Sequence, residues 1–203
     1  MTANMFRKIR VGLTYLSGVV NQRYVVLPNP LKQRFLRSCL PPNRPRIFVE
    51  TGTFKGDTVE KMRHLCDRVI SIELDRALYE AAKLRFSPYP NVEIIFGDCT
   101  QKIPELLTGL EAPTLFWLDG HWSGKGTSKG TEEEPIIAVL SALAQRPGPY
   151  TVVIDDARTF DGKSGYPYLH QVLQVLTEID PRYSISVNND LIVATLSGFV
   201  AKE

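Results

Sequence analysis

The stretch RIFVETGTFKG, residues 46–56, decides the fold. It begins with a short apolar run that ends in the acid Glu50 and continues into a turn containing Gly52 and Gly56. Glycine permits a tight turn, a close approach of the backbone to a ligand and close packing where a helix begins. Two glycines four residues apart do not fit the three-glycine dinucleotide fingerprint. The stretch therefore predicts a strand, a ligand-binding turn and a helix.

Apolar strands and amphipathic helices alternate downstream of this turn. Further strands are predicted at residues 69–73, 92–96, 114–118 and 151–154, separated by helices at 77–86, 103–107 and 132–145. A helix at 168–179 precedes two strands, 183–187 and 191–196, joined by the hairpin signal Asn188-Asn189-Asp190. Alternation requires crossover connections. The predicted fold class is therefore α/β: a doubly wound, mostly parallel seven-stranded sheet with a C-terminal antiparallel hairpin and an N-terminal helical extension.

The N-terminal segment differs in charge from the rest of the chain. Residues 1–46 hold nine basic residues and no acid, whereas residues 47–203 carry 15 basic and 22 acidic residues, a net charge of −7. The prolines at 41–45 predict a boundary between a basic helical extension, 1–45, and a main domain, 46–203. We expect helices at 6–20 and 31–40, and either an anionic partner or docking of the extension onto its own acidic body.

Composition excludes several protein classes. A chain of 203 residues that is 43% hydrophobic can bury a core without disulfide or metal staples. No run approaches the roughly 18 apolar residues of a membrane-spanning helix, and no small-residue cleavage site follows the first apolar stretch. Three widely spaced cysteines without a Cys-x-x-Cys motif argue against a disulfide scaffold or a cysteine zinc site. We expect a cytoplasmic protein; a homodimer is one assembly that the sequence leaves open.

An acid stands at or beside the end of each of the five predicted parallel strands. These acids are Glu50, Glu73, Asp98, Asp119 and the pair Asp155 and Asp156. Ligands of open α/β sheets bind beyond the carboxyl ends of the strands, and an acid after the second strand suits the two hydroxyls of a ribose. Carboxylates gathered at one rim repel one another unless a ligand or cation compensates. The pattern predicts a binding site at this rim.

With these motifs, residues 46–203 resemble the class I S-adenosylmethionine-dependent methyltransferases. The turn at residues 50–56 matches the first motif of that family, Glu73 stands where the family binds the ribose, and Gly97-Asp98 matches the acid that reads the adenine amino group. The resemblance implies an enzyme that transfers a methyl group from bound S-adenosylmethionine. It implies the following cofactor-binding residues: Glu50, Gly52, Thr53, Gly56, Glu73, Asp98, Cys99 and Asp119.

Within that superfamily, the motif layout is most similar to the metal-dependent small-molecule O-methyltransferases. Leu118-Asp119-Gly120-His121 and Ile154-Asp155-Asp156 resemble the segments between which those enzymes hold magnesium. The resemblance implies a Mg2+ site at Asp119, Asp155 and Asp156, with Asp119 and His121 as catalytic candidates. Carboxylates suit such a hard cation, which lowers the pKa of a substrate hydroxyl. The expected acceptor is a small polar molecule, although no catechol-type pocket can be matched.

The same residues leave other interpretations open. Asp119 could cap a turn, Asp155 and Asp156 could cap a helix or pair with Arg158, and His121 could be a general base, a metal ligand or an exposed loop residue. The DNA enzymes that methylate a base amine carry Asn/Asp-Pro-Pro-aromatic where this chain reads Asp119-Gly120-His121-Trp122. Nucleic acid is therefore not the expected partner. Two alternative functions are an enzyme of the same fold with other nucleotide chemistry, and a cofactor-holding module recruited by its basic N-terminus.

Overall fold

The computed structural model describes residues 27–43, 45–119, 135–163 and 165–196. Helices and strands alternate along this part of the chain, and their bounds follow in chain order. They are α2 (Asn29–Ser38), β1 (Ile47–Thr51), α3 (Asp57–Met62), β2 (Arg68–Glu73), α4 (Arg76–Phe86), β3 (Val92–Phe96), α5 (Cys99–Leu107), β4 (Thr114–Leu118), α6 (Pro135–Gln145), β5 (Tyr150–Ile154), the 3-10 turn η1 (Ala157–Thr159), α7 (Leu169–Ile179), β6 (Ser184–Asn188) and β7 (Leu191–Thr195).

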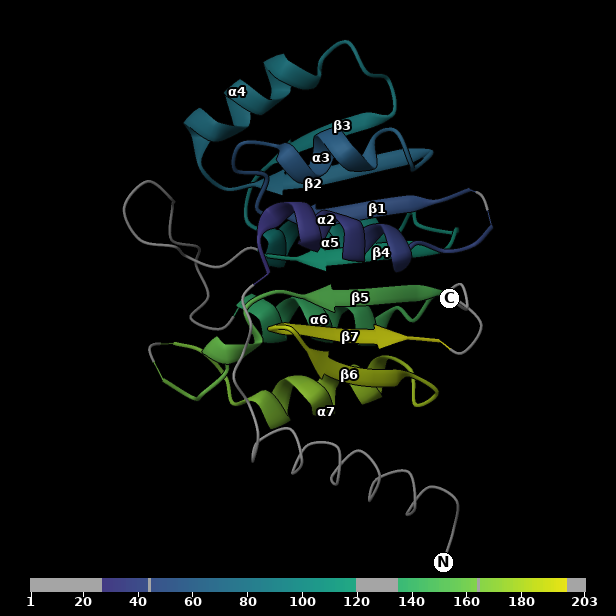
Figure 1. The fold of residues 1–203 in the computed structure, drawn as a ribbon, viewed down its shortest axis with the longest axis vertical. Coiled ribbons are helices and arrows are strands. Elements are labelled where there is room, and N and C mark those ends of the chain that lie inside the picture. Colours follow the sequence, from purple (N-terminus) through teal and green to yellow (C-terminus); the bar gives the residue numbers. More distant parts are fainter. Residues whose placement is uncertain (1–26, 44, 120–134, 164, 197–203) are drawn as a thin grey trace, which may run out of the picture.

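The strands form one seven-stranded sheet in the order β3-β2-β1-β4-β5-β7-β6 (Figure 1). The first five strands are parallel to one another, and β7 runs antiparallel between β5 and β6. Asn189 and Asp190 take positive φ angles of 50° and 67°, as a tight hairpin between β6 and β7 requires. The predicted fold class, including the antiparallel hairpin, is confirmed.

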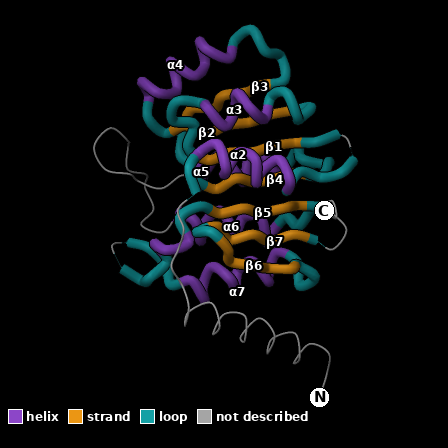
Figure 2. Tube along the Cα trace, in the orientation of Figure 1, coloured by secondary structure: helices purple, strands orange, loops and turns teal. Residues whose placement is uncertain are grey.

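Helices cover both faces of the sheet, so its central strands are apolar on both sides (Figure 2). On one face, α5, α6 and α7 pack through Ile103, Leu140 and Leu176. On the other face, α2, α3 and α4 form a second cluster that includes Leu36 and Phe86. Every residue of β1, β4 and β5 is buried.

Helix α2 packs directly on the sheet although it lies in the basic N-terminal segment. Pro30 lies in its first turn, where the missing N–H is not needed. Leu36, Cys39 and Leu40 are buried in the same apolar cluster as Trp117 of β4. The helix expected at 6–20 lies outside the described residues. Among the described residues, no helix combines the length and the apolar character needed to cross a membrane.

One helix begins well before its predicted first residue. Helix α5 begins at Cys99, four residues before the predicted start, because Asp98 caps it through a hydrogen bond from the Thr100 N–H. The sequence pattern indicates a ligand contact for Asp98 and not a helix cap, so the predicted helix begins too late. Helix α6 is described from Pro135, and its predicted first residues, 132–134, lie outside the described part.

Candidate active site

The turn after β1 has the backbone conformation that the glycine pattern predicts. Gly52 has a φ of 87° and Gly56 a φ of 75°, a region that strongly favours glycine. The Gly52 N–H donates to the Ile72 carbonyl at 2.9 Å. A Cβ at Gly56 would lie 2.6 Å from Cε2 of Phe86, so this glycine also lets α3 approach α4 closely. The turn is held rigidly between β1 and β2.

Glu73, at the end of β2, ties this turn in place. Its Oε2 accepts the Phe54 N–H at 2.8 Å, and its Oε1 accepts the Asp75 N–H at 2.9 Å. The side chain lies at the carboxyl edge of the sheet, and the residue is buried. The acid expected to meet a ribose therefore also fixes the backbone of the glycine turn.

Glu50 is a buried acid at the end of β1. Its Oε2 accepts a hydrogen bond of 2.7 Å from the Ser71 hydroxyl, which in turn lies 2.7 Å from the Thr53 hydroxyl. Burial, helped by the charges of Asp119 and Glu73 and opposed by the hydroxyls of Ser71 and Thr58, raises the pKa of Glu50 to about 8. Glu50 is thus largely protonated near neutral pH, where it can donate a hydrogen bond as well as accept one.

Asp98 follows β3, whose neighbour in the sheet is β2 with Glu73 at its end, and Cys99 begins α5. Asp98 Oδ1 accepts hydrogen bonds from the N–H and the hydroxyl of Thr100, at 2.9 and 2.8 Å. Burial, with the nearby Asp98 charge, raises the pKa of the Cys99 thiol to about 12. The Cys99 thiol is therefore neutral near pH 7.

The three aspartates expected to bind metal do meet at one place. Strands β4 and β5 are neighbours, and carboxylate oxygens of Asp119, Asp155 and Asp156 lie within 4.8 Å of one another. Burial and the charges of Asp155 and Asp156 raise the pKa of Asp119 to about 8, whereas the charge of Lys32 lowers it. Oxygen ligands at this spacing fit a hard divalent cation. We call these three residues the carboxylate cluster.

Asp156 also makes the ion pair with Arg158 that the sequence leaves open as an alternative to metal binding. Its Oδ1 accepts from Nη1 of Arg158 at 2.8 Å. Its backbone is left-handed, with a φ of 55°, and although it precedes η1 its side chain makes no capping hydrogen bond. Asp190 of the hairpin supports this segment, because its Oδ1 accepts the Arg158 N–H at 2.8 Å and its Oδ2 pairs with the Arg158 guanidinium. The terminal hairpin therefore positions one edge of the cluster.

Lys32 joins the cluster from α2, and no motif in the sequence indicates this role. Its ammonium pairs with Asp155 Oδ2, although the two residues are 123 positions apart. The only signal was indirect: the excess of basic residues at the N-terminus and of acids in the body. The second catalytic candidate, His121, lies outside the described residues.

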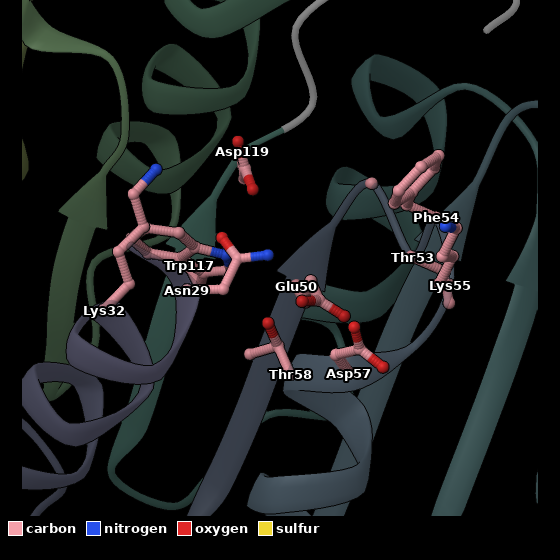
Figure 3. Close-up of a pocket in the computed structure, with 11 residues that line it drawn as sticks. Asn29, Lys32, Glu50, Thr53, Phe54, Lys55, Asp57, Thr58, Trp117 and Asp119 are labelled. Atoms are coloured by element: carbon pink, nitrogen blue, oxygen red, sulfur yellow. The ribbon is translucent and has the colours of Figure 1, made fainter. Parts of the chain in front are cut away.

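A small cavity of about 60 Å3 connects the glycine turn with the cluster. Glu50, Phe54 and Thr58 line one side, and Lys32, Trp117 and Asp119 line the other (Figure 3). Trp117 Nε1 is buried and, among the described residues, has no hydrogen-bond partner. A buried indole N–H without a partner is costly, so an acceptor atom of a ligand would satisfy it. Asp119 belongs both to this cavity and to the carboxylate cluster.

Comparisons with known proteins were made for both sequence and fold. No family model matches the sequence. A ribosomal RNA small subunit methyltransferase A from Thermotoga petrophila is 26% identical over 152 residues, which are 69% of this chain and 50% of that protein. The chain thus spans about half the length of this curated relative.

Solved structures match over most of the chain. An O-methyltransferase from Bacillus cereus in complex with S-adenosylhomocysteine has a TM-score of 0.55 at 13% identity, covering 96% of this chain and 91% of the other. The O-methyltransferase TomG of tomaymycin synthesis from Streptomyces achromogenes, in complex with S-adenosylmethionine, has a TM-score of 0.55 at 17% identity, covering 86% and 82%. These matches confirm the predicted fold, and the three proteins reported above are all named as methyltransferases.

Proposed function

We propose that this chain, which has the fold of the class I S-adenosylmethionine-dependent methyltransferases, transfers a methyl group from S-adenosylmethionine to an oxygen of a small polar molecule. The observation that carries the proposal is the position of Asp119, which lies both in the cavity beside the glycine turn and in the carboxylate cluster. A methyl donor in the turn would then meet an acceptor hydroxyl at the cluster. The expected enzyme is cytoplasmic.

The cofactor would lie across the carboxyl ends of β1, β2 and β3. Glu73 would bind the ribose hydroxyls, and Asp98 beside Cys99 would read the adenine. Glu50, Gly52, Thr53 and Gly56 would surround the methionine part, together with Asp119. Two observations support this arrangement. Gly52 has a positive φ angle, and the Glu73 carboxylate is fixed by hydrogen bonds from two backbone N–H groups.

Methyl transfer is a direct displacement, so the protein must hold the two reactants in line and remove the hydroxyl proton. Asp119 suits the proton transfer, because its carboxyl group lies in the cavity beside the glycine turn. His121 remains a second candidate for this role. A divalent cation such as Mg2+, held by Asp119, Asp155 and Asp156, would lower the pKa of the acceptor hydroxyl and orient it.

Methylation of RNA is a second candidate, because the Thermotoga relative is named as a ribosomal RNA methyltransferase. One experiment separates the two candidates. The full chain is incubated with S-adenosylmethionine carrying a labelled methyl group, with either a small-metabolite extract or total RNA as acceptor. We expect label in the metabolite fraction, release of S-adenosylhomocysteine and loss of both in Asp119→Asn. Label in RNA alone would support the second candidate, and absence of cofactor binding by calorimetry would refute both.

A further inference from the structure

Lys32 is one of two described cations that pair with the carboxylate cluster; the other is Arg158, on Asp156. Unlike Arg158, Lys32 comes from a distant part of the chain. Its ammonium pairs with Asp155, whose side chain is only 2% exposed, while the Lys32 side chain itself is 14% exposed. The helix that carries it is fixed to the sheet by Leu36 and Cys39. Lys32 is therefore held at the cluster and is not a surface lysine that meets an acid by chance.

The ion pair with Lys32 occupies Oδ2 of Asp155, an atom that a bound cation would need. Asp155 Oδ1 accepts the Asp156 N–H at 2.9 Å, and Oδ2 accepts from Lys32. A divalent cation within the 4.8 Å span of the cluster would lie beside the Lys32 ammonium. Like charges at such a distance repel strongly where the surroundings are buried. The ammonium and a divalent cation are therefore alternative occupants of one position.

We propose that Lys32 is the built-in counter-ion of the carboxylate cluster, and that a divalent cation binds there only when the Lys32 ammonium moves away. This inference rests on the proposed function, which assigns the cluster to a cation. Lys32 neutralises the cluster when it is empty, and the flexible lysine stem lets the ammonium turn into the adjoining cavity, which Lys32 already lines. Lys32 thus sets the affinity of the site for metal and couples metal binding to helix α2.

The test is direct binding of Mn2+ to the full chain, measured from the electron paramagnetic resonance signal of the free ion. We expect Lys32→Met, which keeps the length of the apolar stem, to bind Mn2+ at least about tenfold more tightly than the parent. The matched control is Arg34→Met, which removes a charge from an exposed position of the same helix and should change the affinity less than about twofold. The gain should disappear in Lys32→Met/Asp155→Asn.

A second measurement uses the parent protein and does not depend on how a variant folds. Mn2+ should increase the labelling of Lys32 by an amine-reactive ester relative to the exposed Lys61, read by peptide mass spectrometry. Equal Mn2+ affinity in parent and Lys32→Met, no binding by either, or unchanged labelling of Lys32 would overturn the proposal. Neither measurement needs the methyl donor, so a failure of methyl transfer would be recognised separately.

Discussion

Replacement of Glu50 by glutamine is expected to change how the stability of the protein depends on pH. Glu50 is 2% exposed and its carboxyl pKa is raised to about 8, chiefly by burial, against an ordinary value of 4.5. The folded protein therefore holds this proton more tightly than the unfolded chain does. The stabilisation is fully present below pH 4.5 and is lost as the pH rises through 8.

The size of the effect follows from the two pKa values. Each pKa unit corresponds to about 1.4 kcal/mol, so a folded carboxyl that titrates near 8 should cost the parent roughly 3 kcal/mol of unfolding free energy between pH 5.5 and 8.5. Glutamine keeps the shape of the protonated carboxyl and an oxygen that accepts from Ser71, but it has no charge to bury. Glu50→Gln should lack this loss.

Urea unfolding of both proteins at several pH values measures the effect. The other titrating groups are common to the two proteins, so the difference between their unfolding free energies isolates Glu50. We expect the difference in unfolding free energy between variant and parent to grow, in favour of the variant, by roughly 3 kcal/mol from pH 5.5 to pH 8.5. Two pH profiles that run parallel to within about 0.5 kcal/mol would show that buried Glu50 does not carry the proton assigned to it.

Three further outcomes are expected. Glu73→Ala should weaken S-adenosylmethionine binding by about 2–3 kcal/mol in calorimetry, because it removes a charge-assisted contact and the support of the glycine turn; unchanged affinity would contradict the cofactor assignment. Gly56→Ala should lower the free energy of unfolding by more than about 1 kcal/mol, because its Cβ meets Phe86, whereas Gly109→Ala, whose Cβ would lie 3.9 Å from the Leu106 carbonyl oxygen, serves as a mild control. Excess chelator should abolish methyl transfer, with Asp155→Asn likewise inactive; full activity in chelator would reduce the cluster to a positioning role.

The parts of the fold that could be predicted are those that depend on local sequence patterns. Alternating apolar runs predicted the sheet, and Asn189-Asp190 predicted the hairpin turn that the positive φ angles confirm. The meeting of Asp119 with Asp155 followed from the sheet alone, because parallel strands end at one edge. The pairing of Lys32 with Asp155 could not be predicted, because it depends on where α2 packs. The two residues are 123 positions apart, and no local sequence pattern links them.

The insertion of β7 between β5 and β6 has a consequence for the order in which the protein folds. The carboxylate cluster is supported from Lys32 near one end of the described chain and from Asp190 near the other. Contacts between such distant segments form late, because the chain must first pay the entropy of closing long loops. A ribosome-bound chain that has released β1 to β4 could already arrange its glycine turn, but the carboxylate cluster is complete only once the last hairpin has joined the sheet.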